Sequence, residues 1–94
     1  MIADKDRVII EKMAAKYRAK RVVLFGSSLY QDRESHDIDI GVEGLEDKDF
    51  FTFYGELLFA LSKPVDVVDI SAKSRFAELI KREGVLLYGC NRTG

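Results

Sequence analysis

The sequence predicts an α/β (α+β) fold in which helices pack on a small mixed β-sheet. Three segments carry apolar residues at helical spacing, and short runs rich in β-branched residues lie between them. This alternation along the chain is typical of two packed layers of secondary structure. The chain has 94 residues, which predicts a single domain over residues 1–94.

Residues 4–19 are predicted to form the first helix. Asp4 or Asp6 is available to cap its N-terminus. Its apolar positions recur three and four residues apart and are Ile9, Ile10, Met13, Ala14 and Tyr17.

A continuous apolar run over residues 22–25 predicts a strand that is covered on both faces. Gly26 and Ser27 end this run. We expect a short helical turn over residues 28–31 and a polar loop over residues 32–36.

Alternating apolar residues over 37–42 predict the second strand. Asp47 is then placed to cap a helix over residues 48–62. Phe51 and Phe53 fall outside the predicted inward stripe of this helix, which consists of Phe50, Tyr54, Leu57, Leu58 and Leu61.

Pro64 separates this helix from a third strand over residues 65–70. Ser71 or Ser74 is predicted to cap a last helix that ends at Glu83. The residues of this helix predicted to face inward are Phe76, Leu79 and Ile80.

Gly84 is predicted to terminate the last helix as its C′ residue, and residues 85–88 to form the final strand. The order is then helix, strand, turn, strand, helix, strand, helix, strand. It predicts a compact sandwich of helices on a small sheet, without repeats or linkers.

Composition and charge exclude several classes of function. The net charge is −1, with acidic and basic residues interleaved, so no broad cationic face is available for extended nucleic-acid binding. A single nucleotide needs only a local phosphate site and is not excluded. The lone cysteine, Cys90, excludes an internal disulfide and is typical of the reducing cytoplasm. No run approaches the roughly 18 apolar residues of a membrane span, and no signal-peptide pattern begins the chain.

An Asp-x-Asp pair lies in the second predicted strand. Asp37 and Asp39 share one face of it, whereas Ile38 and Ile40 take the other face, toward the core. Adjacent ionised carboxylates repel each other, and a hard divalent cation such as Mg²⁺ removes that repulsion. In isolation such a pair is more often two solvated residues, so its surroundings decide the interpretation.

Two other features supply those surroundings. Asp66, among the valines of the third strand, offers a third carboxylate and is preferred to Asp69, which faces the opposite way. Gly26 lets the backbone approach a phosphate, and the N–H and hydroxyl groups of Ser27 can hold an anion. A turn, a cap or a solvated charge explains each feature alone. Together they indicate a phosphate site beside a metal site.

These motifs resemble the signature of the minimal nucleotidyltransferases (MNT antitoxins), which belong to the DNA polymerase β-like nucleotidyltransferase superfamily. The resemblance covers nearly the whole chain and implies the palm fold of that superfamily. The matching segments are Val22-Val23-Leu24-Phe25-Gly26-Ser27, Asp37-Ile38-Asp39-Ile40, Val65-Asp66-Val67-Val68 and the closing Glu83-Gly84-Val85.

The resemblance implies a Mg²⁺-dependent enzyme that transfers a nucleoside monophosphate, AMP from ATP, to a hydroxyl group. Asp37, Asp39 and Asp66 would be the catalytic residues and the ligands of two Mg²⁺ ions, and Asp66 would also orient the attacking hydroxyl. Gly26 and Ser27 would bind the nucleotide through its phosphates. The resemblance also implies a partner, a HEPN-family toxin, whose tyrosine receives the AMP, so that the protein acts as an antitoxin.

Two departures from the family pattern keep an alternative open. Residues 28–31 lack the usual Arg and Gly, and the spacer before Asp37 is one residue shorter than usual. The alternative is a catalytically weak or inactive antitoxin that neutralises its toxin by binding alone. A nucleotidyltransferase that modifies an antibiotic would need a second domain. Phe51 and Phe53 leave assembly with a second copy or with a partner open.

Overall fold

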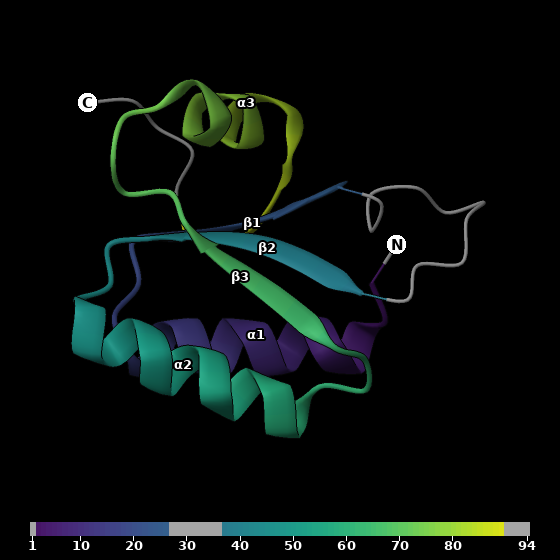
Figure 1. Ribbon diagram of the computed structural model, residues 1–94. Helices are drawn as coiled ribbons and strands as arrows, with labels where there is room; N and C mark the ends of the chain where they lie inside the picture. Colours follow the sequence, from purple (N-terminus) through teal and green to yellow (C-terminus); the bar gives the residue numbers. More distant parts are fainter. Residues whose placement is uncertain (1, 27–36, 90–94) are drawn as a thin grey trace.

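Within the described residues, four strands form one mixed sheet with helices on both faces (Figure 1). The computed structural model describes residues 2–26 and 37–89. The predicted fold class and order of elements are confirmed, while the expected turn over residues 28–31 lies outside the described residues. The elements are α1 (Asp4–Lys16), β1 (Arg21–Phe25), β2 (Ile38–Glu43), α2 (Asp47–Ala60), β3 (Val65–Asp69), α3 (Arg75–Glu83) and β4 (Val85–Gly89).

The strands lie in the order β3-β2-β1-β4. Strand β1 pairs antiparallel with both β2 and β4, whereas β2 pairs parallel with β3. A parallel pair needs a crossover connection, and α2 supplies it between β2 and β3. Strand β3 is therefore an edge strand of the sheet.

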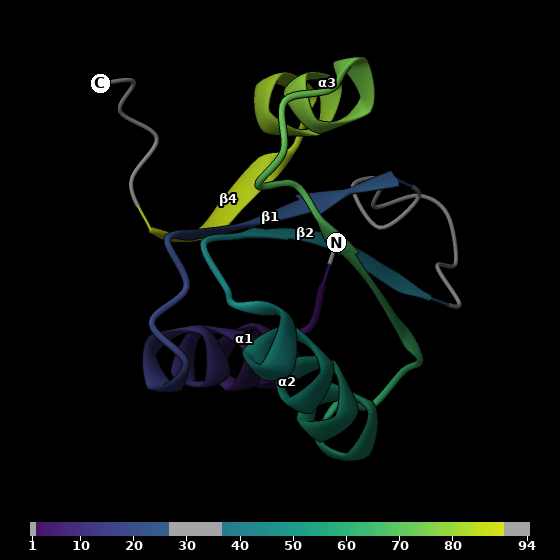
Figure 2. The ribbon, with the colours of Figure 1, turned by 60° about the vertical axis from the view of Figure 1, so that its left-hand side comes forward.

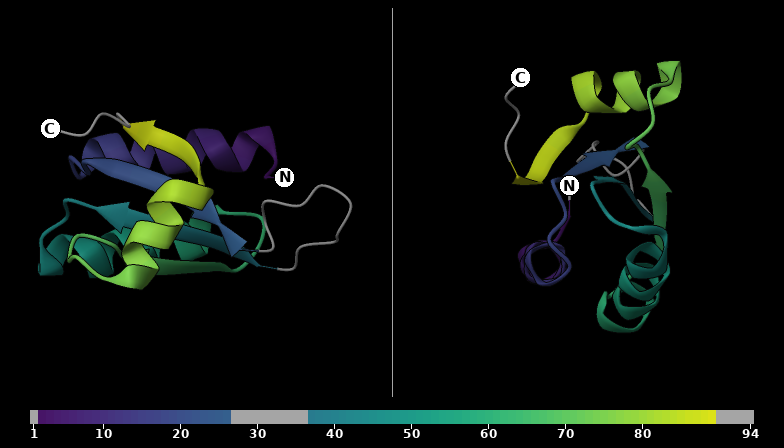
Figure 3. Two further views of the ribbon diagram at one scale, coloured as in Figure 1. Left: turned by 90° about the horizontal axis from the view of Figure 1, so that it is seen from above. Right: turned by 90° about the vertical axis from the view of Figure 1, so that its left-hand side faces the viewer.

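The two faces of the sheet are covered unequally. Helices α1 and α2 lie side by side on one face, and α3 is the one described helix on the other (Figures 2 and 3). Alternate residues of β1 enter the two cores, with Leu24 toward α1 and α2 and Val23 toward α3. This double coverage explains why β1 is apolar throughout its middle. None of the described helices combines the length and the apolar character that a membrane crossing requires.

The inward face of α2 differs from the predicted one at two positions. Phe53, predicted to lie off the stripe, is completely buried, and its ring packs edge-on against Tyr17 at 6.2 Å between centroids. Leu58, predicted to face inward, is 53% exposed. These two residues flank the stripe on opposite sides, and α1 packs on the Phe53 side. Phe51 is exposed, as its position off the stripe suggested.

The prediction for α3 is right at Ile80, which is buried, and wrong at Phe76 and Leu79, which are about half exposed. Ala77 takes the second inward position. A single helix meets the sheet along a narrow stripe, so residues at the sides of that stripe remain accessible. Phe76 instead turns its ring toward Phe25, with 6.0 Å between the ring centroids.

The predicted caps are correct for α3 and wrong for α1. Ser74 caps α3, since its hydroxyl accepts a 3.0 Å hydrogen bond from the backbone N–H three residues later. Helix α1 begins after Ala3 without a side-chain cap, and Asp4 is already its first residue. Asp6 is buried instead, where its carboxylate accepts hydrogen bonds from the backbone N–H and the hydroxyl of Ser62.

Two further helix ends differ from prediction. Glu46, not Asp47, is the cap residue of α2, and it makes no side-chain cap hydrogen bond. Gly84 is the C-cap of α3 with a φ of −78°, so it is not a left-handed C′ residue. A β-carbon at Gly84 would lie 2.3 Å from Val23 Cγ1, so close packing against β1 explains the glycine.

Candidate active site

Three strands bring the predicted site residues to one end of the sheet. Phe25, the last residue of β1, lies opposite Asp39 of β2. Asp39 in turn lies opposite Asp66 in the parallel pairing of β2 and β3. Gly26 follows Phe25 directly, so the glycine and the two acids occupy neighbouring positions, although they lie far apart in the sequence.

The β2 acids are positioned by burial of the isoleucines between them. Ile38 and Ile40 are 2% and 0% exposed, which places them in the α1–α2 core as predicted. Asp39 is therefore held on the opposite face and is half-buried. Asp37 precedes β2 and is exposed.

Of the two β3 acids, only Asp66 lies opposite Asp39. Asp69 lies opposite Val42 at the other end of the pairing. The Asp69 carboxylate accepts a 2.9 Å hydrogen bond from the backbone N–H of Ser71, so it stabilises the turn after β3.

Gly26 lies directly against the Asp39 carboxylate. Its φ of 71° belongs to the left-handed region, which favours glycine. A β-carbon at this position would also be only 2.6 Å from Asp39 Oδ2. Backbone conformation and space therefore both require glycine at the end of β1. Ser27, the other predicted nucleotide-binding residue, lies outside the described residues.

Asp39 is a half-buried carboxylate that lies near two other carboxylates. Its pKa lies above the ordinary value of 3.8, first because burial disfavours the charged form. The charges of Asp66 and, more weakly, Asp37 raise the pKa further. A cation at this point would relieve both repulsions, and three carboxylates are a suitable ligand set for Mg²⁺.

Asp39 and Asp66 are neighbours, but the site acids do not form a complete metal-binding site. Among residues 2–26 and 37–89, no three His, Cys, Asp or Glu side chains are close enough together to hold a metal ion as they stand. Asp39 and Asp66 are fixed by strand register, whereas Asp37 stands outside β2. The donor chemistry of these oxygen ligands thus fits Mg²⁺, although the three side chains are not gathered around one point in this structure.

Sequence reasoning missed Tyr54, which it treated only as part of an apolar stripe. The Tyr54 hydroxyl donates a 3.1 Å hydrogen bond to Asp66 Oδ1. Burial, followed by the hydrogen bond to Asp66 and the charge of Asp66, raises the pKa of Tyr54. The sequence offered one signal for this role, namely that a tyrosine within an apolar stripe usually hydrogen-bonds a partner through its hydroxyl.

Three cationic side chains, from β1, α3 and the residue before β1, surround the opposite end of β2. Glu43, the last residue of β2, has its carboxylate 3.4 Å from Arg21 Nε, 3.4 Å from Lys81 Nζ and 3.6 Å from Lys20 Nζ. Because Glu43 and Asp39 lie at opposite ends of the strand, these three cations balance Glu43 and do not reach the acid pair.

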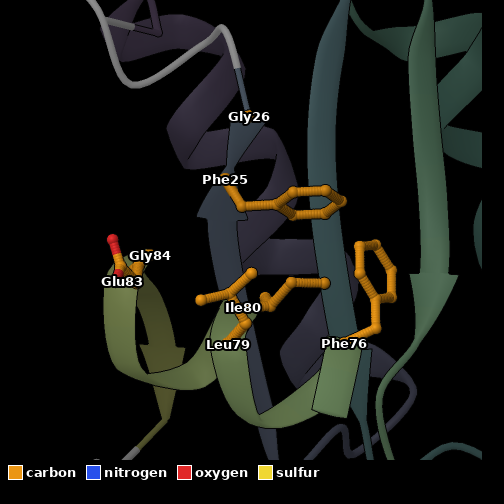
Figure 4. Close-up of a pocket in the computed structure, with 7 residues that line it drawn as sticks. All are labelled: Phe25, Gly26, Phe76, Leu79, Ile80, Glu83 and Gly84. Carbon is orange, nitrogen blue, oxygen red and sulfur yellow. The ribbon is translucent and has the colours of Figure 1, made fainter. Parts of the chain in front are cut away.

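A cavity of about 320 Å³ begins at Gly26 and extends between β1 and α3 (Figure 4). Its wall is mainly apolar, with one acidic group at the side, and includes Phe25, Phe76, Leu79, Ile80 and Glu83. The cavity therefore suits an apolar or aromatic group close to the acids.

The fold of this chain is similar to that of chains in solved toxin–antitoxin structures. A chain in a toxin–antitoxin structure with AMP-PNP superposes with a TM-score of 0.71 at 25% identity, covering 94% of this chain and 75% of that one. A chain in the tri-AMPylated Shewanella oneidensis HEPN toxin–MNT antitoxin complex gives 0.68 at 26% identity, covering 90% and 71%. A chain in an MntA–HepT toxin–antitoxin structure gives 0.67 at 25% identity, also covering 90% and 71%.

Comparison with curated protein sequences finds no match. The family model described as "Polymerase beta, Nucleotidyltransferase" matches residues 8–93, which include all the elements that carry the site. The chain belongs to the polymerase β nucleotidyltransferase family, as its motifs predicted.

Proposed function

We propose that this protein is a Mg²⁺-dependent nucleotidyltransferase that moves AMP from ATP to a hydroxyl of a partner protein. We propose further that the acceptor is a tyrosine of a HEPN toxin, that residues 1–94 act as a single domain, and that the protein works as a cytoplasmic antitoxin. The observation that carries the proposal is the strand register that sets Asp39 opposite Asp66, with the Gly26 backbone against Asp39.

The similar structures support the choice of nucleotide and acceptor. One of them is a toxin–antitoxin structure with AMP-PNP, and another contains a tri-AMPylated HEPN toxin with its MNT antitoxin. These ligands and partners belong to those proteins. For this chain they make ATP the first nucleotide and a HEPN protein the first acceptor to test.

The mechanism assigns a role to each residue. When bound by Asp37, Asp39 and Asp66, Mg²⁺ would neutralise charge on the phosphates. The backbone N–H of Gly26, together with Ser27, would hold the β- and γ-phosphates. The acceptor oxygen forms a bond to the α-phosphorus, the bond to the β-phosphate oxygen breaks, and pyrophosphate leaves. Asp66 orients the acceptor hydroxyl and accepts its proton.

The test is transfer of label from α-³²P-ATP, with Mg²⁺, to a HEPN toxin protein supplied as the acceptor. Asp66→Asn should abolish the transfer and leave the fold intact. Asp69→Asn is the matched control, because it makes the same chemical change at another exposed position of the same strand, away from Asp39. Equal transfer by wild type and Asp66→Asn would overturn the assignment.

A second candidate function is antitoxin action by binding alone. It is favoured by one observation, namely that no three metal-ligating side chains are gathered within the described part of the chain. The same experiment distinguishes the two functions. Stable complex formation and toxin neutralisation without label transfer would establish the binding module and refute the enzyme.

A further inference from the structure

The hydrogen bond between Tyr54 and Asp66 connects two layers of the fold. Tyr54 belongs to α2, below the sheet, and Asp66 belongs to β3, at its edge (Figure 1). Val65 and Val67 enter the core beneath the sheet, so strand alternation gives Asp66 to the other face. Because no strand lies beyond β3 among the described residues, the Tyr54 hydroxyl can reach Asp66 Oδ1 at this edge.

The two partners differ greatly in how firmly they are held. Asp66 is exposed on an edge strand, where a short carboxylate side chain would otherwise choose freely among its rotamers. Tyr54 is half-buried, contacts the α1–α2 core, and packs edge-on against Phe50 with 6.3 Å between ring centroids. The phenol ring therefore provides a fixed donor for a carboxylate that lacks other restraint from packing.

We propose that Tyr54 is a positioning residue, which fixes the Asp66 carboxylate so that its second oxygen faces Asp39 and the reacting groups. The hydrogen bond occupies Oδ1 and leaves Oδ2 to meet a metal ion or the acceptor hydroxyl. Groups that orient a ligating carboxylate in this way commonly contribute 10- to 100-fold to metal affinity or activity, as an order of magnitude. This inference rests on the proposed function.

The same contact would have the opposite effect if it held Asp66 away from Asp39. Tyr54 would then be a latch, and its removal would improve metal binding. The two roles predict changes of opposite sign, so a single substitution separates them.

The experiment compares Tyr54→Phe with Tyr17→Phe. Both substitutions remove one hydroxyl from a half-buried tyrosine on the same helix layer, but the Tyr17 hydroxyl interacts with Glu56 instead of a site acid. The first readout is binding of Mn²⁺ alone, followed by electron paramagnetic resonance, which needs no turnover. The second is label transfer from α-³²P-ATP as a function of Mg²⁺ concentration. Thermal melting of both variants reports any loss of folding.

We expect Tyr54→Phe to weaken Mn²⁺ binding and to raise the Mg²⁺ concentration for half-maximal transfer, each by roughly 10-fold or more. Tyr17→Phe should match wild type in Mn²⁺ binding and in the Mg²⁺ dependence of transfer. The melting temperatures of the two variants should change by similar amounts. Unchanged or tighter Mn²⁺ binding by Tyr54→Phe would overturn the positioning role.

The two proposals fail in different ways. A wild type that binds Mn²⁺ without transferring AMP would refute the proposed enzyme and still test Tyr54 through the metal readout. A wild type that neither binds Mn²⁺ nor transfers AMP would refute both proposals.

Discussion

Substitution of Gly26 by alanine should separate activity from stability in this fold. The new methyl group would lie 2.6 Å from Asp39 Oδ2, whereas ordinary van der Waals contact begins at 3.4 Å. The carboxylate must therefore move by about 0.8 Å, or turn away from the site. A displacement near 1 Å in a catalytic group can reduce the rate by roughly 100-fold.

Gly26→Ala should affect the stability of the fold less than it affects the reaction rate. Placing alanine in a left-handed conformation costs about 1–2 kcal/mol, and the Asp39 side chain can yield to the methyl group. The free energy of unfolding of small domains is roughly 5–15 kcal/mol, so the variant should remain folded. Urea denaturation measures the loss in the free energy of unfolding, and label transfer from α-³²P-ATP measures activity.

Gly44→Ala is the matched control. Gly44 also has a positive φ, of 92°, but its β-carbon would meet the Lys20 backbone nitrogen at 2.8 Å, an atom that cannot rotate away. Such overpacking adds about 1–3 kcal/mol to the conformational cost. We therefore expect Gly44→Ala to be the less stable variant and Gly26→Ala the less active one. Activity that falls in the same order as stability would refute the reasoning.

Three further predictions concern charge and packing. The pKa of Asp39 is raised in the folded state, so folded protein binds the Asp39 proton more tightly than unfolded protein does. The contribution of Asp39 to the free energy of unfolding therefore falls as pH rises above about 3.8. Metal-free Asp39→Asn should consequently melt higher than wild type at pH 7, with the difference disappearing by pH 3.5 in a series of melting curves; a constant difference would contradict this origin. Phe53→Ala should lower the free energy of unfolding in urea by about 3–5 kcal/mol, whereas Phe51→Ala, at a 73% exposed position, should change it by less than about 0.5 kcal/mol. Asp6→Ala removes a buried acceptor from two Ser62 donors and should cost about 2–4 kcal/mol in the same assay, with a loss under 1 kcal/mol arguing against a structural role for this pair.

The order of elements and the relation of the acids to the sheet could be predicted because both follow from short-range pattern. Continuous apolar residues indicated β1, and alternation around Ile38 and Ile40 indicated which face Asp39 would take. The valines around Asp66 and strand alternation then indicated Asp66, rather than Asp69, as the third acid, and the register sets it opposite Asp39.

The errors arose where the answer depends on neighbouring elements. Helical spacing allowed either Phe53 or Leu58 to complete the inward stripe of α2, and only the position of α1 decides between them. Phe76 was expected inside because it is large and apolar, but one helix cannot cover its whole side of the sheet. The sequence could suggest that the Tyr54 hydroxyl has a partner, but that this partner is Asp66 depends on tertiary geometry.

The pairing of β2 with β3 also couples burial of the core to the alignment of the site acids. Val65 and Val67 are buried on either side of Asp66, and side chains alternate strictly along a strand. A slip by one residue would expose both valines and force the carboxylate into the core, which is far less stable than the native register. Misregistered pairings are thus disfavoured by their own instability, and a chain that buries both valines also sets Asp66 opposite Asp39. Folding of the core therefore also sets the backbone positions of these two acids.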